Sequence, residues 1–422
     1  MRILQLSWEY PPLVYGGLGR HVHALAEAEA ALGHEVTVLT QHVEGAADDE
    51  TVRGVRIIRV PYDPPIVPQS DLLAWVLGLG HAIARAGSRL GEQWRPDIVH
   101  AHDWLMCHAG TALKEAFGVG LVATMHATEA GRHQGWLPSP LSRAIHTTEW
   151  WLTFEARRVI TCSAHMRWEV TRLFELPPDK VDLVANGIDR ATWSVPASTA
   201  AAARVRYAGT GPLLVYAGRL EWEKGMHTLL EAMPRLRRRH PGLHLVVAGD
   251  GTFGAELRER AKAARLGPSV AFTGFLPREE LAAVVAAADC AVVPSLYEPF
   301  GLAALEAAAL GTPLVVSDVG GLREFARGGA CASLVTPGDP AALAAGISLV
   351  LDDEVLARRL VRTARQRLGS NHSWPALAAR TVDTYARAAD EERVLQAGLS
   401  AKELRPLHLA VRDGNLLTGD VS

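Results

Sequence analysis

Cysteine is scarce in this sequence. The 422 residues include four cysteines, Cys107, Cys162, Cys290 and Cys331, and no two of them form a Cys-x-x-Cys pair. A disulfide framework and a cysteine-based zinc site are therefore not expected. The spacing fits reduced thiols in the cytoplasm.

Long hydrophobic runs are also missing. The longest candidate run, residues 72–80, ends at His81, far short of the ~20 residues that span a bilayer. Glu9 and Pro11 interrupt the apolar run at the N-terminus, which is unlike a signal peptide. We expect a cytoplasmic protein without a transmembrane segment, and docking on a membrane surface is left open.

No strong excess of charge of either sign is present. The formal net charge is -3, which gives no reason to expect a nucleic-acid partner. Apolar residues make up 48 % and charged residues 21 %, as in soluble globular enzymes. The length indicates two domains, each with its own core. The sequence gives no indication of the oligomeric state.

Short apolar and β-branched runs alternate with helical patterns along the chain. These runs are 2–6, 35–39, 55–58, 97–100, 121–124, 158–161, 180–184, 213–216, 243–247, 270–272, 290–293 and 313–316. They predict parallel sheets covered by helices on both faces. There are enough of them for two doubly wound α/β domains.

Turn-forming and small residues between about 190 and 212 predict the domain boundary. The first domain is expected over residues 1–195 and the second over 210–370. A last helical pattern covers 374–389, and the tail at 395–422 is expected to be peripheral. Because open parallel sheets bind ligands at the carboxyl ends of their strands, the cleft between the two sheets is the predicted site.

Three predicted loops on the first domain carry candidate residues. Gly16 and Gly17 follow the first strand, where the backbone can approach a ligand and a helix N-terminus favours an anion. The third glycine of a dinucleotide fingerprint is missing, because Val22 takes its place. A plain strand-to-helix turn therefore stays open as the alternative.

The second and third loops contain His100-Ala-His102-Asp103 and His126. Histidine and aspartate can ligate a metal. However, side chains alternate between the two faces of a strand, so few of these groups are expected to converge, and no metal site is predicted. We interpret Asp103 as a hydrogen-bonding group for sugar hydroxyls. His126 is a cleft residue or an ordinary structural histidine.

Two predicted loops on the second domain carry charge. Arg219 follows a strand directly, and Lys224 precedes a helix that starts near Met226. Arginine binds a diphosphate with a fork of donors and lysine binds it as a point charge, so this loop predicts a phosphate site. A solvated loop neutralised by Glu221 and Glu223 is the alternative.

The last loop runs from Glu298 to Glu306. Pro299 fits the first position of a helix, which would leave the N–H groups of Phe300, Gly301 and Leu302 free to bind an anion. Glu306 is the only charge in an apolar helix and needs hydrogen-bond partners if it is buried, which ribose hydroxyls would supply. The alternative is that Glu298 is an acidic residue at the N-terminus of the helix and that the side chain of Glu306 faces water.

Together these loops resemble the GT-B glycosyltransferases of the glycogen-synthase-like group, glycosyltransferase family 4 type. Residues 298–306 match the E-x7-E motif of that group, and the likeness covers nearly the whole chain. The runs at 7–12, 100–104 and 126–132 resemble bacterial α-1,4-glucosyltransferases that make glycogen or methylglucose lipopolysaccharides.

The resemblance implies a retaining transfer of a hexose, such as glucose, from UDP- or ADP-glucose to an α-glucan or oligosaccharide. The catalytic residues would be Arg219, Lys224, Glu298, His126 and Asp103. The donor-binding residues would be Gly16, Gly17, Gly249, Thr273, Phe275, Phe300, Gly301, Leu302 and Glu306. It further implies that the C-terminal helix packs back on the first domain.

Two features modify what the resemblance implies. No Asp-x-Asp motif is present, so we predict that no metal or other cofactor is needed and that Arg219 and Lys224 replace it. Typical bacterial glycogen synthases have a lysine before the glycine pair and an aspartate where Arg20 stands. Here Val14 and Tyr15 precede the glycines, so a preference for ADP-glucose is not implied.

Three alternative functions remain at this point. A nucleotide-sugar 2-epimerase uses the same fold but would lack the Arg219, Lys224, Glu298 and Glu306 combination. A mannosyltransferase or related enzyme acting on a lipid or small molecule would need a basic first-domain surface. A non-catalytic binding protein would lack some of the expected site residues.

Overall fold

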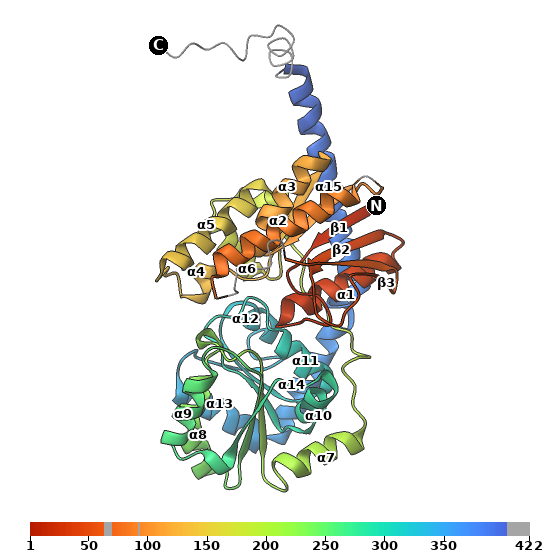
Figure 1. Ribbon diagram of the computed structural model, residues 1–422. Coiled ribbons are helices and arrows are strands. Elements are labelled where there is room, and N and C mark those ends of the chain that lie inside the picture. Colours follow the sequence, from red (N-terminus) through yellow and green to blue (C-terminus); the bar gives the residue numbers. More distant parts are fainter. Residues whose placement is uncertain (63–69, 92, 403–422) are drawn as a thin grey trace.

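The computed structural model describes residues 1–62, 70–91 and 93–402. Two sheets with helices around them form two domains, one above the other in Figure 1. This architecture is the predicted GT-B arrangement of two Rossmann-like domains.

The first sheet has the strand order β3-β4-β2-β1-β5-β6-β7-β8. Its strands are β1 (Arg2–Leu6), β2 (Glu35–Gln41), β3 (Asp49–Val52), β4 (Val55–Val60), β5 (Ile98–His102), β6 (Gly120–Met125), β7 (Arg158–Thr161) and β8 (Val181–Leu183). Neighbouring strands are parallel except β3 and β4, which form a hairpin through Arg53 and Gly54, both at positive φ. The sequence did not predict β3, because its residues are polar and largely exposed.

The second sheet has the order β11-β10-β9-β12-β13-β14, and all its strands are parallel. They are β9 (Leu213–Ala217), β10 (His244–Ala248), β11 (Val270–Gly274), β12 (Cys290–Val293), β13 (Leu314–Ser317) and β14 (Ser333–Val335). This is the order of dinucleotide-binding sheets, in which ligands bind where the order reverses, here between β9 and β12. The three-residue strand β14 was not predicted.

Helices cover both faces of each sheet (Figure 1). Those of the first domain are α1 (Gly17–Ala31), α2 (Leu72–Leu90), α3 (Cys107–Phe117), α4 (Glu129–Arg132), α5 (Pro140–Glu155) and α6 (Ala164–Leu173). Those that follow are α7 (Ala197–Tyr207), α8 (Met226–Arg239), α9 (Gly254–Ala263), α10 (Arg278–Ala287), α11 (Leu302–Leu310), α12 (Gly320–Ala326), α13 (Pro340–Asp352), α14 (Glu354–Asn371) and α15 (Trp374–Lys402).

Helix α7 lies in the stretch predicted as the domain boundary. Its alanine-rich sequence has high helix propensity. Arg204 holds it against the second domain by donating hydrogen bonds to the carbonyls of Ala287 and Gly211, at 2.9 and 2.8 Å. The boundary stretch therefore contains a docked helix.

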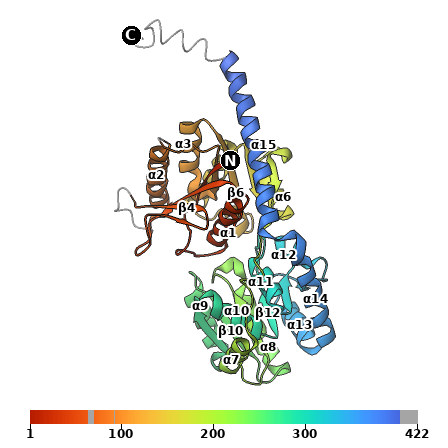
Figure 2. The same ribbon diagram turned by 90° about the vertical axis from the view of Figure 1, so that its right-hand side faces the viewer.

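Helix α15 crosses from the second domain and runs along the first domain (Figures 1 and 2). Its Tyr385 is fully buried and donates a 2.9 Å hydrogen bond to Glu29 on α1. The predicted end of the helix at residue 389 is corrected by the structure, since the helix continues to Lys402 and so includes the start of the predicted peripheral tail. Contacts such as Arg158 Nη2 to Glu391, at 2.5 Å, hold the helix beyond residue 389. Residues 403–422 lie outside the described part of the chain.

Candidate active site

The glycine loop of the first domain reaches the second domain. A Cβ atom added to Gly17 would lie 2.6 Å from Cδ1 of Leu302, and one added to Gly16 would lie 3.9 Å from Cδ of Arg219. The predicted donor-side residues of both domains are therefore neighbours across the cleft. A side chain at position 17 would require the side chain of Leu302 on α11 to shift.

Glu9 holds this loop and was not predicted as a site residue. Its buried carboxylate accepts hydrogen bonds from the N–H groups of Tyr15, Gly16 and Gly19, at 2.5, 3.3 and 3.0 Å. Burial raises the pKa of Glu9, although these three N–H groups lower it. A charged residue three positions after the end of a buried strand was the available signal in the sequence.

Asp103 and His126 meet on the wall formed by the first domain. Asp103 has φ +61° and accepts a 2.7 Å hydrogen bond from the N–H of His126. Burial raises the pKa of Asp103 to about 6, although the N–H of His126 and the charges of Arg132 and Arg219 lower it. The carboxyl group therefore titrates near neutral pH.

The prediction that few of the histidines converge is wrong. His100 and His102 are two residues apart on β5 and so face the same side, with ring centroids 4.0 Å apart. His102 Nδ1 also lies 3.2 Å from His126 Nε2, and the ring of His21 on α1 packs against both. The sequence missed His21, which lies far from the other two along the chain.

Lys224 and Glu298 form an ion pair on the second domain. Nζ of Lys224 lies 2.9 Å from Oε2 of Glu298, and the same oxygen accepts a 3.1 Å hydrogen bond from Ser295. The Lys224 loop is held by Gly225 at φ +67°, where an added Cβ would lie 1.9 Å from the carbonyl oxygen of Pro294. The two predicted residues are thus brought together by a close backbone contact between the β9 and β12 loops.

Arg219 pairs with Glu223, which a residue of the other domain also approaches and which was not predicted as a site residue. Nη2 of Arg219 is 3.5 Å from Oε1 of Glu223, and Nη1 of Arg132 from the first domain is 3.8 Å from the same oxygen. Glu223 therefore joins two cations across the cleft. In the alternative of a solvated loop, Glu223 would be a surface charge that neutralises the cations. In the structure Glu223 is buried.

The start of α11 differs from the prediction. Pro299 is not the first helical residue, because Gly301 takes φ +102° as N-cap and the helix begins at Leu302. No described residue accepts a hydrogen bond from the N–H groups of Phe300, Gly301 or Leu302. These donors are available to an anion at the mouth of β12.

Glu306 is buried on α11, and Arg20 from the first domain is its ion-pair partner. Burial raises the pKa of Glu306, and Arg20 opposes that effect. The solvated-side-chain alternative for Glu306 is therefore wrong. Part of the carboxylate's hydrogen-bonding need is met by Arg20 rather than left for a ligand.

Gly249, Thr273 and Phe275 lie at the ends of β10 and β11. Gly249 has φ +141° and donates a 2.8 Å hydrogen bond to the carbonyl of Gly274, and an added Cβ would lie 2.0 Å from Gly218 O. Thr273 bonds to backbone carbonyls, and the side chain of Phe275 is 72 % exposed. An exposed aromatic ring at this edge is free to contact a ligand.

Buried hydrogen bonds join the two domains beside these loops. Tyr297 donates to Glu169 Oε1 at 2.7 Å and accepts from the N–H of Thr128 at 3.2 Å. Ser163 donates to the carbonyl of Pro299 at 2.7 Å. These bonds fix the loop before α11 against the first domain.

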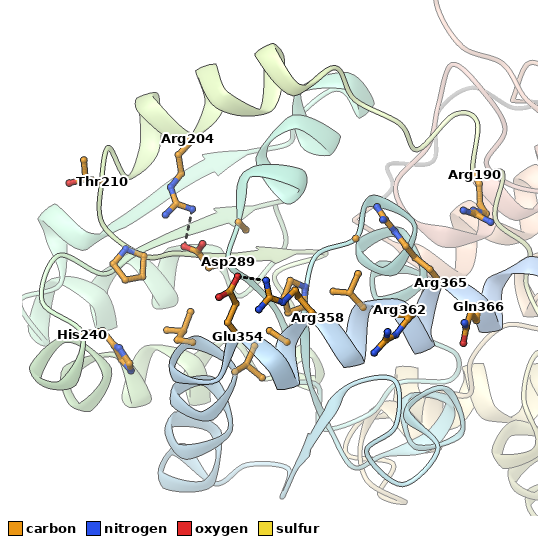
Figure 3. Close-up of a pocket in the computed structure, with 18 of the residues that line it drawn as sticks. Arg190, Arg204, Thr210, His240, Asp289, Glu354, Arg358, Arg362, Arg365 and Gln366 are labelled. Carbon is orange, nitrogen blue, oxygen red and sulfur yellow. Dashed lines mark ion pairs between the residues drawn. The ribbon is translucent and has the colours of Figure 1, made fainter.

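A cavity of about 1050 Å³ lies elsewhere, between α7, α14 and the amino-terminal ends of β9, β12 and β13 (Figure 3). Arg204 pairs there with Asp289 at 2.8 Å, and Arg358 pairs with Glu354 at 2.9 Å. The described residues that line it include none of the predicted site residues. We base the site on the cleft because strand ends, free N–H groups and cations coincide there.

Comparison with known proteins gives the family. Residues 15–192 match the model of Glycosyltransferase Family 4, and residues 200–367 match that of Glycosyl transferases group 1. A glycogen synthase of Mycobacterium tuberculosis is 48 % identical over 416 residues, which cover 96 % of this chain and 99 % of that protein. The chain belongs to these glycosyltransferases.

Two further relatives resemble this glycosyltransferase. A D-inositol 3-phosphate glycosyltransferase of Frankia alni is 34 % identical, over 88 % of this chain and 95 % of that protein. The solved structure of a sucrose-phosphate synthase from Thermosynechococcus elongatus has a TM-score of 0.80 and 28 % identity, over 92 % of this chain and 98 % of that one. In the described residues, no helix is long and apolar enough to cross a bilayer.

Proposed function

We propose that this glycosyltransferase transfers a glucosyl unit from a nucleotide-glucose donor to an α-glucan, forming an α-1,4 linkage with retention of configuration. One observation carries the donor side of the proposal. Lys224 pairs with Glu298 just before the free N–H groups of α11, and Arg219, after β9, acts on the charge of Asp103 from across the cleft. The 48 % identity to a glycogen synthase supports the glucosyl group and the glucan acceptor.

The proposed roles follow from charge. When the bond between the sugar and the nucleoside diphosphate breaks, negative charge grows on the leaving phosphate. Arg219, Lys224 and the N–H groups of α11 would stabilise that charge without reorganising. Glu298, held by Lys224 and Ser295, would accept hydrogen bonds from hydroxyls of the transferred sugar. The acceptor hydroxyl forms the new bond, and its proton goes to the leaving phosphate oxygen.

Glu306 is proposed to bind the ribose. Because Arg20 occupies its carboxylate, donor binding would replace or share that ion pair. Gly16 and Gly17 would approach the donor from the other wall, and Gly249, Thr273 and Phe275 would border the nucleotide. No metal is required in this scheme, since two side-chain cations and the helix N–H groups face the phosphates.

A small phosphorylated acceptor is the second candidate. The names of two relatives, an inositol 3-phosphate glycosyltransferase and a sucrose-phosphate synthase, refer to phosphorylated molecules. Arg132 lies on the acceptor wall, 3.8 Å from Glu223, and would offer a cation to such a group. The α-glucan is preferred because the relative with higher identity is a glycogen synthase.

The test is a matrix of donors and acceptors. ADP-, UDP- and GDP-glucose and GDP-mannose are each incubated with maltooligosaccharides, a hexose phosphate, inositol phosphate, lipid vesicles or no acceptor. Nucleotide release and product mass are measured. Release with a glucose donor and elongation of the maltooligosaccharide are expected. Epimerised donor without acceptor, or release only with a lipid or phosphorylated acceptor, would replace the proposal.

A further inference from the structure

Three imidazoles from separate parts of the first domain converge beneath the cleft. They belong to His21 near the start of α1, His102 at the end of β5 and His126 after β6. One potential ligand atom from each residue lies within 4.8 Å of the other two. The fold therefore assembles three nitrogen donors at the carboxyl edge of one sheet.

The hydrogen bonding of this cluster is incomplete. Nδ1 of His21 and Nε2 of His102 are buried and have no hydrogen-bond partner in the described structure. A buried polar atom without a partner costs about 1–3 kcal/mol. His100, next to the cluster, is different. One ring nitrogen lies 2.6 Å from the hydroxyl of Tyr385 and the other 2.7 Å from that of Thr124. The unpaired atoms therefore belong to two of the three convergent residues, His21 and His102, and not to their buried neighbour.

The protonation state suits ligation. Burial lowers the pKa of His126 to about 3, and burial and the neighbouring histidines lower the pKa of His21 and His102 well below the ordinary value. These shifts favour neutral imidazole, which is the form that binds a metal ion.

We propose that His21, His102 and His126 bind a divalent ion of the Zn²⁺ or Co²⁺ type, with a fourth position open to the cleft. Nδ1 of His102 and Nε2 of His126 are already 3.2 Å apart. Zinc–nitrogen bonds of about 2.0–2.1 Å in a tetrahedron place two ligands about 3.3 Å apart. The ligand atom of His21 lies within 4.8 Å of the other two. To reach the spacing of about 3.3 Å, side-chain rotation has to bring it closer to them by at most about 1.5 Å.

None of the three histidines is among the groups proposed to stabilise the leaving diphosphate, so the ion is not assigned a catalytic role. His126 is the only one of the three that is partly exposed, which makes it the point of entry. Ligation displaces the proton shared by His102 and His126. It also engages His126, which is among the catalytic residues that the family resemblance implies, so the ion inhibits transfer. This inhibition rests on the proposed function, whereas binding of the ion does not.

Binding is tested on the full chain with Co²⁺ alone. The visible absorption of the ion is followed during titration, and stoichiometry is measured after dialysis. Wild type is expected to bind one ion with the intense spectrum of a tetrahedral site. His21→Gln and His102→Gln each remove a ligand and are expected to weaken binding by at least about tenfold. His100→Gln, on the same strand as His102, is the matched control and keeps the spectrum.

Circular dichroism establishes that each variant is folded. If His102→Gln does not fold, His21→Gln carries the test. A weak octahedral spectrum in the wild type, or equal binding by all variants, overturns the proposal.

Inhibition is tested separately. Zn²⁺ is expected to slow hexosyl transfer by the wild type and by His100→Gln, and a chelator restores the rate. His21→Gln is expected to keep metal-free turnover and to lose sensitivity to Zn²⁺. A chain with no transferase activity but a tetrahedral Co²⁺ spectrum would refute the proposed function and retain the metal site. Transfer that is insensitive to Zn²⁺, in a chain with that spectrum, would refute inhibition alone.

Discussion

Replacing Lys224 by glutamine tests the role of the cation nearest to Glu298. The side chain of Lys224 is 16 % exposed, and its Nζ lies 2.9 Å from Glu298 Oε2. A unit charge about 4 Å from the leaving phosphate contributes about 4 kcal/mol at an effective dielectric constant of about 20. Loss of one such preorganised group typically lowers kcat by about 10²–10³, or about 2.7–4 kcal/mol. Lys224→Gln is therefore expected to lower kcat in that range.

The assay is steady-state nucleotide release with the donor identified in the matrix of substrates. Lys114→Gln is the matched control, because Lys114 is 12 % exposed and also ion-paired, with Glu155, but lies outside the cleft. Both variants remove one positive charge from a largely buried pair, and their melting temperatures are compared. A Lys224→Gln enzyme with wild-type kcat, or an equal loss of kcat in Lys114→Gln, would refute the reasoning.

Three further predictions concern donor binding, backbone geometry and pH. Glu306→Gln is expected to raise the Kd for the nucleoside diphosphate about tenfold, because a charged hydrogen-bond acceptor is lost. Isothermal titration calorimetry measures this Kd, and an unchanged value contradicts the proposed ribose role. Gly225→Ala is expected to lower the melting temperature more than Gly209→Ala does. Both glycines have positive φ, but only at Gly225 would the added Cβ meet a carbonyl oxygen. Equal decreases in melting temperature would contradict this prediction. Burial raises the pKa of Glu29 to about 8 from 4.5, so its contribution to stability is full below about pH 4.5 and is lost as pH rises to about 8. Between about pH 4.5 and 8, the free energy of unfolding measured by calorimetry should change less with pH for Glu29→Gln than for the wild type. Parallel curves of unfolding free energy against pH would contradict the assignment.

Much of the fold could be predicted because buried parallel strands are continuous apolar runs. Residues 2–6 and 290–293 are examples, and the structure has strands at both. The hairpin strand β3 could not be found in this way, because it is polar and one of its faces meets solvent. Helix α7 was missed because its alanines were interpreted as a weak boundary composition, although alanine is the strongest helix former.

The candidate site was only partly predictable for a related reason. Residues that directly follow a strand, such as Arg219 and Asp103, are placed by the topology alone. Partners such as Arg20 for Glu306 come from the other domain, and no local pattern connects them. The same holds for His21, which meets His102 and His126 only because α1 packs at the edge of the sheet. Long-range pairs of this kind depend on packing that a periodicity argument does not contain.

The most direct test of the central claim is transfer in a chelated buffer. The claim is that Arg219, Lys224 and the N–H groups of α11 stabilise the leaving diphosphate without a metal ion. Nucleotide release and product formation are measured before and after extensive dialysis against EDTA, with and without added Mg²⁺ or Mn²⁺. The account predicts that chelation does not lower kcat, that added Mg²⁺ or Mn²⁺ does not raise it, and that the product is α-linked by NMR. Loss of turnover on chelation, with recovery on adding Mg²⁺ or Mn²⁺, would contradict it.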